Sequence, residues 1–396
     1  MTEQIYHRID NRKQTKGVKG MREFETKLPK LGFGLMRLPQ KGDGLDLSRL
    51  CHMVDAYMEG GMNYFDTAYM YCGGKSESAA KTALVDRYPR ESFYLTDKLP
   101  QWMMHGIEDR DKIFNDQLAR TGAGYFDIYL LHSVEDGSNY EGYVKYDCFN
   151  WAMQKKAEGK IRHFGFSYHG SPELLDEILS KHPEVEIVQI QLNYADWNSP
   201  LVQSGKLYDV LRKHEKPILV MEPVKGGMLA SVAPEIEQMM KNARPDASAA
   251  SWALRFAASL PGVVTVLSGM STEEQMSDNL KTFANFECLT EEEQEIIQQA
   301  RNALTRNPTI QCTACRYCCD GCPRNISIPD IFRAVNTLRL YGEDARPHMF
   351  YRGLTEKSGR ASDCISCGQC EGVCPQHLPI IDLLKEASEK LDVAQV

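Results

Sequence analysis

Short apolar runs alternate with amphipathic segments along most of the chain. Eight runs have the length and the β-branched or aromatic content of strands: residues 31–36, 62–68, 92–99, 126–132, 161–168, 186–194, 217–224 and 263–269. The segments between them repeat apolar residues at helical spacing, and residues 111–122 also begin at Asp and end at Gly. Strict alternation of strand and helix predicts a parallel sheet with right-handed crossovers. Eight such units indicate a (β/α)8 barrel, whereas a doubly wound sheet would give no reason for eight evenly spaced strands.

The pattern changes after the last run. The charged residues 290–304 predict a helix that leads out of the barrel, and helical patterns return in 325–342 and 383–391. We therefore divide the chain into three parts. These are a polar N-terminal segment with a lead-in strand (1–27), the barrel (28–290), and a linker helix with a small C-terminal domain (291–396).

One cysteine pattern occurs twice in the C-terminal part. The run C-x2-C-x2-C-x3-C-P is found at Cys312, Cys315, Cys318 and Cys322, and again at Cys364, Cys367, Cys370 and Cys374. This is the ligand spacing of a bacterial-type ferredoxin with two [4Fe–4S] clusters, in which the fourth Cys of each run binds the other cluster. Two tetrahedral Zn²⁺ sites are the alternative, but the three-plus-one spacing with its trailing Pro favours the clusters. We expect a helical, ferredoxin-like dicluster domain, typical of an anaerobe.

Charge and composition limit the classes of binding partner and the compartment that we expect for this protein. The net charge of −8 disfavours binding to nucleic acid or to a membrane surface. No stretch approaches the about 20 apolar residues that span a bilayer, and the polar N-terminus lacks the apolar core of a signal peptide. Eight of the 13 cysteines lie in the two runs, so their number does not indicate a disulfide framework. We expect a cytoplasmic protein.

Four polar residues stand where a barrel enzyme places its chemistry, at the C-terminal ends of strands. Asp66 ends the second run, Tyr71 lies in the loop after it, and Lys98 and His132 end the third and fourth. A phenol has a pKa near 10, so we expect the Lys98 ammonium, held by Asp66, to lower the pKa of Tyr71 and make it a proton donor. His132 would orient a bound carbonyl. Any one of them alone would more often be a packing or solvated residue.

With these residues the chain resembles the aldo-keto reductases over roughly residues 28–288. The matching sequences are DTAxxY at 66–71, LLHS at 130–133, GKIRHFGFS at 159–167, VQIQLNY at 188–194 and GMSTEEQMSDNL at 269–280. The resemblance implies reduction of a small aldehyde or ketone with NADPH or NADH, or the reverse oxidation of an alcohol. It also implies that Asp66, Tyr71, Lys98 and His132 are the catalytic residues.

The resemblance further implies a cofactor site. Its expected residues are Gly34, Arg37, Ser167, Gln189, Met221, Val224, Gly226, Gly227, Leu229, Gly269, Ser271, Thr272, Gln275 and Asn279. Ser167 and Gln189 match positions that bind the nicotinamide amide, and 269–279 matches the segment that holds the adenosine end. Residues 224–229 match the pyrophosphate loop, where glycine lets backbone N–H groups approach phosphate.

Three positions depart from the family pattern. Tyr168 replaces the usual Asn, and Met221 replaces the aromatic residue that stacks on nicotinamide. Ser271 replaces the Arg that clamps an adenosine 2′-phosphate, which removes the obvious reason to prefer NADP over NAD. The choice between NADP and NAD therefore stays open. Because Tyr168 and Met221 change the expected cofactor pocket, a flavin is a further alternative.

The clusters and the barrel raise a question of coupling. Hydride transfer moves two electrons together, whereas a [4Fe–4S] cluster passes one, and the sequence shows no flavin signature that would convert between them. We favour a carbonyl reductase whose clusters are structural or regulatory. One alternative is a redox enzyme whose barrel holds a flavin or another substrate and is fed through the clusters by a ferredoxin or another electron carrier. A non-catalytic electron-transfer subunit is the second alternative, and the intact set of four residues argues against it.

Overall fold

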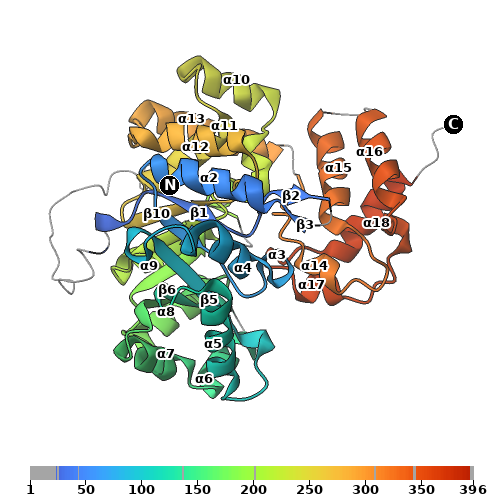
Figure 1. Cartoon of the computed structure of the whole chain (residues 1–396). Helices are drawn as coiled ribbons and strands as arrows, with labels where there is room; N and C mark the ends of the chain where they lie inside the picture. Colours follow the sequence, from blue (N-terminus) through green and yellow to red (C-terminus); the bar gives the residue numbers. More distant parts are fainter. Residues whose placement is uncertain are drawn as a thin grey trace.

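The computed structural model describes residue 24 and residues 26–42, 44–135, 138–199, 202–306, 309–341 and 345–392. Within them, eight parallel strands close into a barrel in the order β1-β10-β9-β8-β7-β6-β5-β4 (Figure 1). The strands are β1 (Leu31–Gly34), β4 (Tyr64–Asp66), β5 (Tyr94–Pro100), β6 (Phe126–Val134), β7 (Ile161–Tyr168), β8 (Ile187–Gln191), β9 (Ile218–Met221) and β10 (Val263–Ser268). Each lies within or overlaps a run predicted from the sequence, so the (β/α)8 prediction is confirmed.

Helices surround this barrel. They are α2 (Leu47–Glu59), α3 (Tyr71–Gly74), α4 (Ser76–Ala80), α5 (Asp109–Thr121), α6 (Ser138–Lys145), α7 (Cys148–Ala157), α8 (Pro172–Lys181), α9 (Ser204–Lys213), α10 (Pro234–Ala243), α11 (Ala249–Ser259), α12 (Glu273–Ala284) and α13 (Glu291–Arg306). A hairpin, β2 (Gln40–Lys41) with β3 (Gly44–Leu45), follows β1. Local sequence sets the helix starts: the Ser171 hydroxyl caps α8, and Pro172 follows at its first position.

Two apolar layers hold the barrel together. Alternate strand residues such as Ile128 and Leu130 pack with Tyr64 and Leu219 in one cluster. Their neighbours Tyr129 and Leu131 belong to the larger cluster that also contains helix residues. This alternation follows from the two-residue repeat of a strand. The inward layer fills the barrel, so reactive side chains can lie only at its ends.

The charged helix predicted after the barrel is α13. It contacts α10 and α11, and the Glu293 carboxylate pairs with the Arg255 guanidinium at 2.7 Å, with both side chains almost fully buried. The helix therefore packs against the barrel before the chain continues to the cysteine runs. The predicted lead-in strand of 1–27 falls mostly outside the described residues, and Phe24, Thr26 and Lys27 are helical.

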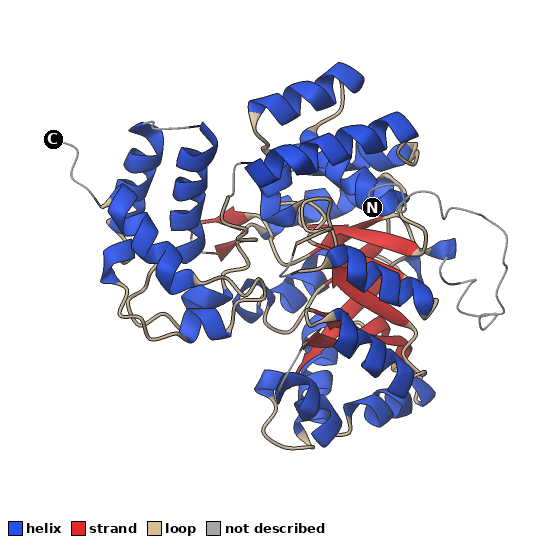
Figure 2. Ribbon diagram, turned by 180° about the vertical axis from the view of Figure 1, so that it is seen from behind, coloured by secondary structure: helices blue, strands red, loops and turns tan. Residues whose placement is uncertain are grey.

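A second apolar core organises the C-terminal part. Its elements are α14 (Tyr317–Asp320), α15 (Ile328–Tyr341), α16 (Ala345–Thr355), α17 (Gln369–Gly372) and α18 (Ile380–Leu391). Phe332 and Val335 of α15 pack with Leu384 and Ala387 of α18, in a cluster separate from that of the barrel. The unit lies beside the barrel as helices and loops (Figure 2). The helices predicted in 325–342 and 383–391 are confirmed as α15 and α18.

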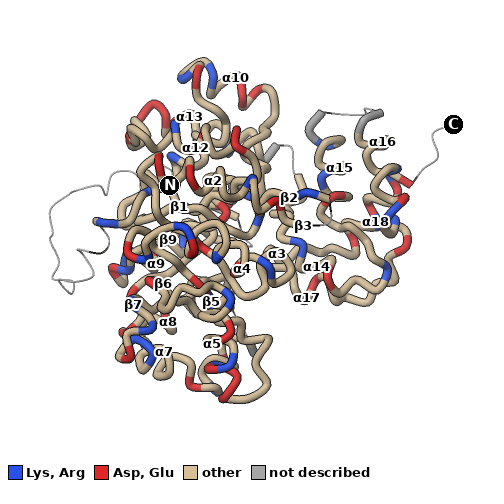
Figure 3. Tube along the Cα trace, in the orientation of Figure 1, with Lys and Arg blue, Asp and Glu red and all other residues tan. Residues whose placement is uncertain are grey.

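Acidic and basic residues are interspersed over both units (Figure 3). Searched over its described residues, the structure has no helix that is long and apolar enough to cross a membrane.

Candidate active site and cluster sites

Four side chains converge at the C-terminal end of the barrel. Asp66 ends β4, Lys98 lies in β5, His132 lies in β6, and Tyr71 opens α3. The Lys98 ammonium donates to Asp66 Oδ1 at 2.5 Å and lies 3.3 Å from the Tyr71 hydroxyl. The rings of Tyr71 and His132 meet edge to face, with centroids 5.9 Å apart. The structure therefore brings the predicted set together as an ion pair with a phenol and an imidazole beside it.

The strand pleat explains why Lys98 points inward. Asp97, its neighbour on β5, accepts a bond from Gln117 of α5 at 2.7 Å, on the outer side of the barrel. Lys98 is fully buried and makes a further bond to a backbone carbonyl at 2.8 Å. Gln189 of β8 donates to the second Asp66 oxygen at 3.0 Å. Both members of the buried ion pair are therefore hydrogen-bonded, as buried charges require.

Burial sets the protonation of the phenol and the imidazole. It raises the pKa of Tyr71 well above its ordinary value, and the Asp66 and Glu222 carboxylates add to this. The sequence predicted the opposite direction. The structure differs because Asp66 offsets the Lys98 ammonium and because burial penalises a phenolate. Burial, followed by the Lys98 charge, lowers the pKa of His132 well below 6.5. Tyr71 is therefore protonated and His132 neutral at neutral pH.

An aromatic residue that sequence reasoning missed lies over His132. The Trp102 ring centroid is 5.0 Å from that of the imidazole, and 42% of Trp102 is exposed. The His132 Nδ1 atom is buried and has no partner among the described residues. The available signal was the position of Trp102, in the loop directly after the strand that carries Lys98.

A groove opens beside Tyr71. Most residues expected at the cofactor line it: Gly34, Arg37, Gln189, Met221, Val224, Gly226, Gly227, Gly269, Ser271, Gln275 and Asn279. Asp66 and Tyr71 line its inner end. A Cβ placed on Gly227 would meet nothing within 4 Å, so this backbone is open to a ligand. The groove thus runs from the loops after β9 and β10 to the Tyr71 phenol.

Three residues expected at the cofactor do not line this groove. The Ser167 hydroxyl accepts a bond from the Ser133 backbone N–H at 2.7 Å. Leu229 is completely buried in the main core, and Thr272 caps α12 through the Gln275 backbone N–H. Gln189 lines the groove, but its amide nitrogen is already bonded to Asp66. Each polar side chain among them has a partner within the fold, which the sequence alone did not show.

The three departures from the family pattern lie in different surroundings. Met221 lines the groove. The Ser271 hydroxyl donates to the Arg37 carbonyl at 2.7 Å, which ties the two lining loops together. Tyr168 is fully buried, and its hydroxyl donates to the Ser171 carbonyl at 2.6 Å. The Tyr168 hydroxyl therefore stabilises the loop after β7, and Tyr168 does not line the groove.

The eight cysteines of the two runs line two separate cavities. Cys312, Cys315 and Cys318 share the inner cavity, of about 310 Å³, with Cys374 from the second run. The outer cavity, of about 340 Å³, is lined by Cys364, Cys367, Cys370 and by Cys322 from the first run. Each cavity therefore combines three cysteines of one run with the fourth of the other, the crossed arrangement expected for two clusters.

The donor set of each cavity fits an iron–sulfur cluster. Four soft thiol donors line each cavity, which is the ligand set of a [4Fe–4S] cluster.

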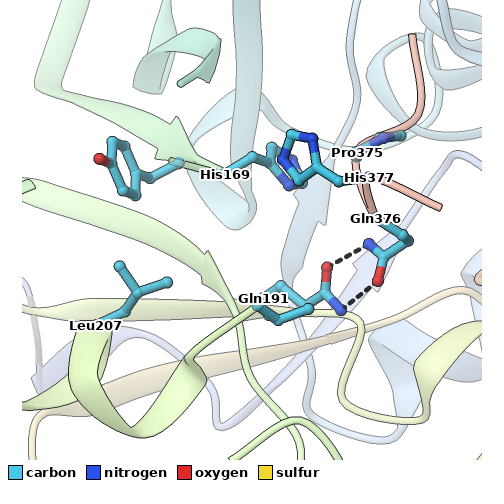
Figure 4. Close-up of a pocket in the computed structure, with 8 residues that line it drawn as sticks. His169, Gln191, Leu207, Pro375, Gln376 and His377 are labelled. Carbon is cyan, nitrogen blue, oxygen red and sulfur yellow. Dashed lines mark hydrogen bonds between the residues drawn. The ribbon is translucent and has the colours of Figure 1, made fainter. Parts of the chain in front are cut away.

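The inner cavity abuts the barrel mouth. Gln376, two residues after Cys374, exchanges two amide hydrogen bonds with Gln191 at the end of β8, at 3.0 and 2.6 Å (Figure 4). Both glutamines are almost fully buried. On the other side, the Arg37 guanidinium donates to the carbonyl of Thr313, which lies between two cysteines of the first run. The C-terminal unit therefore docks on the barrel at the C-terminal ends of its strands.

Tyr317, between Cys315 and Cys318, comes close to the side chains that converge at the barrel mouth. Its partly buried phenol interacts electrostatically with Tyr71, Lys98 and Glu222, and burial raises its pKa well above the ordinary value. Sequence reasoning did not single out this residue, because no motif indicates which end of the barrel the cysteine domain covers.

Comparison with known proteins agrees with both halves of this architecture. The aldo/keto reductase family model matches residues 30–302, and a 4Fe-4S dicluster domain model matches residues 311–379. The chain belongs to the aldo/keto reductase family and carries a C-terminal 4Fe–4S dicluster domain. It is an oxidoreductase.

Individual relatives cover the barrel. An uncharacterized oxidoreductase of Bacillus subtilis is 25% identical over 68% of this chain and 92% of its own length. An aldo-keto reductase of Bacillus halodurans, solved in its holo form, is 25% identical with a TM-score of 0.55, over 68% of this chain and 91% of that one. An aldo-keto reductase of Klebsiella pneumoniae, solved in complex with NADPH, shares the fold at 21% identity and a TM-score of 0.54, over 69% of this chain and 90% of that one.

Proposed function

We propose that this protein reduces a small aldehyde or ketone with NADPH or NADH, or oxidises the corresponding alcohol. The observation that carries the proposal is the Lys98–Asp66 pair beside the Tyr71 hydroxyl, at the inner end of a nucleotide-sized groove. A nicotinamide bound in that groove supplies the hydride. The groove fits such a cofactor because its wall includes the open backbone of Gly227.

The residues of the chain would divide the remaining work. Tyr71, kept protonated by burial, would give its proton to the oxygen of the carbonyl. The phenolate left behind would be stabilised by the Lys98 ammonium at 3.3 Å. His132, neutral and with an unpartnered ring nitrogen, would orient the same oxygen. Trp102 would cover the substrate from outside.

The test is Tyr71→Phe in anaerobically purified protein with both clusters assayed as iron and sulfide. Turnover of a carbonyl substrate should fall by roughly 10²–10⁴-fold, while nucleotide affinity stays unchanged. Tyr69→Phe is the matched control, because the Tyr69 hydroxyl of the same loop bonds Asp116 outside the pocket. Near-normal turnover in the Tyr71 variant would contradict the proposal, and loss of turnover in Tyr317→Phe alone would move the proton donor to Tyr317.

A second function is favoured by one observation, the docking of the inner cavity on the barrel mouth. In that case the barrel would hold a flavin or another substrate that receives electrons through the clusters from a ferredoxin or another carrier. A flavin assay on the anaerobic protein separates the two functions. Bound flavin, together with failure to bind either nicotinamide nucleotide, would support the second.

A further inference from the structure

One arginine connects the nucleotide groove with the first cysteine run. Arg37 follows β1 and lines the groove. Its guanidinium donates to the Thr313 carbonyl and lies 3.4 Å from Glu222 Oε1, after β9. Because Thr313 lies next to Cys312, a single side chain reaches the groove, a carboxylate and a cluster-binding segment at once.

The pyrophosphate loop forms a second connection at the same place. A Cβ on Gly226 would lie 2.3 Å from the Thr313 carbonyl oxygen, so the loop packs directly on the backbone of the cysteine run. The next residue, Gly227, faces open space. The two glycines have positive φ angles of 65° and 99°. One short turn therefore touches the cysteine segment at one residue and is open to the groove at the next.

Glu222 supplies negative charge between the two sites. Its Oε2 atom is buried and has no partner among the described residues. Its carboxylate interacts electrostatically with the thiols of Cys312 and Cys315, on the inner cavity. The positive charge of Arg37 thus partly neutralises the Glu222 carboxylate. This carboxylate lines the groove and also acts electrostatically on the thiols of the inner cavity.

We propose that Arg37 and Glu222 couple occupancy of the nucleotide groove to the redox state of the inner cluster. The coupling rests on the proposed function, since it assumes that a nucleotide binds in the groove. An anionic pyrophosphate entering beside Arg37 competes with Glu222 and Thr313 for the guanidinium and adds negative charge. A reduced cluster carries one more negative charge than an oxidised one. Like charges disfavour each other across this short, partly buried junction.

The coupling acts in both directions by thermodynamic necessity. Reduction of the inner cluster weakens nucleotide binding, and nucleotide binding lowers the reduction potential of that cluster. The outer cluster has no comparable link, because its cavity contacts neither Arg37 nor the loop at 225–230. The affinity of the barrel for its nucleotide thereby responds to the supply of one-electron reductant.

The test uses ADP-ribose and 2′-phospho-ADP-ribose, which carry the pyrophosphate but no nicotinamide and so exchange neither hydride nor electrons with the protein. Their dissociation constants are measured by calorimetry on the oxidised holoprotein and on the same protein reduced by dithionite. An anaerobic potentiometric titration followed by electron paramagnetic resonance is run with and without the ligand. We expect roughly fivefold weaker binding to the reduced protein, and a matching fall of about 40 mV in one of the two cluster potentials.

The Glu222→Gln variant tests whether Glu222 carries the coupling and which of the two clusters responds to the ligand. The amide keeps the size of the side chain and can still accept from Arg37, but it removes the charge. The affinity ratio should fall to less than about twofold, and the potential of the ligand-sensitive cluster alone should rise. Glu177→Gln removes an equal charge from the exposed pair with Lys181 on α8 and should change neither.

The outcomes separate the two proposals. Equal affinity of both redox states for a ligand that does bind would overturn the coupling and leave the proposed function standing. Equal shifts of both cluster potentials would also overturn it, because they would not pass through Arg37 and Glu222. Failure of both nucleotides and of NADPH and NADH to bind the oxidised protein would overturn the proposed function and the coupling with it.

Discussion

The two cysteine cavities share one sequence motif but lie in different surroundings. The inner cavity is lined by Thr313 and Gln376, both of which bond the barrel. The outer cavity ends at Cys367, which is exposed, and at Ile365, which is 58% exposed. The shared motif therefore predicts the same ligand for both cavities, and only the docking shows which cavity lies against the barrel.

The two cavities also differ in their access to solvent. The outer cavity reaches the protein surface through its exposed cysteine, Cys367. The inner cavity meets the barrel at Arg37, Gly226 and Gln191, around the pocket mouth. The two sites are thus placed in sequence from the protein surface to the barrel, although their ligands come from both runs.

The largest expected contrast comes from removing one thiol in each cavity. Cys315→Ser should release residues 311–317 from the barrel and lower the free energy of opening this segment by several kcal/mol, because the cluster organises its ligand loop. Cys367→Ser should leave the opening of this segment nearly unchanged. Hydrogen exchange of 311–317 in the anaerobic proteins measures both. Equal effects of the two variants would break the distinction between inner and outer sites.

A smaller contrast is expected between two neighbouring glycines. Gly226→Ala adds both left-handed strain and a clash with the Thr313 backbone, for a cost of about 2–4 kcal/mol. Gly227→Ala adds only the strain, about 1 kcal/mol. The difference should appear in the exchange protection of 311–317, which only the first variant lowers. A similar loss of protection in both would mean that the loop does not press on the cysteine segment.

The smallest effect is expected at the paired amides. Gln191→Leu removes both bonds of the Gln376 amide to Gln191, and Gln376→Leu leaves the Gln191 amide with its bond to Asp196 alone, so each variant costs about 1–3 kcal/mol. The double variant should recover part of that cost, with a coupling energy of about 0.5–3 kcal/mol. The stabilities are compared in a double-mutant cycle of thermal unfolding with intact clusters. Strictly additive losses would show that the two glutamines do not stabilise the docked arrangement.

Much of this protein was accessible from its sequence because local rules governed it. Short apolar runs that alternate with helical segments predicted all eight barrel strands, and strand-end positions brought Asp66, Lys98 and His132 together. The pKa direction of Tyr71 was missed because burial can be judged only in three dimensions. That Ser167 and Thr272 do not line the groove was inaccessible for a similar reason, since their hydroxyls have partners that depend on the local backbone.

The docking of the two units lay beyond sequence reasoning. Arg37 bonds a residue 276 positions away, and Gln191 meets a partner 185 positions away. No periodicity or motif spacing encodes such pairs, because they depend on the shapes of two separately folded surfaces. Gly226 and Gly227 look identical in the sequence, yet only the first touches the cysteine segment.

The crossed cysteines also have a consequence for how the C-terminal unit can change. Cys374 completes the cavity of the first run, and Cys322 completes the cavity of the second run. Each cavity therefore joins segments of the chain that are separated by α15 and α16. A deletion of either run leaves the other with three of its four thiols. Neither half of the unit therefore holds a complete set of four thiols on its own.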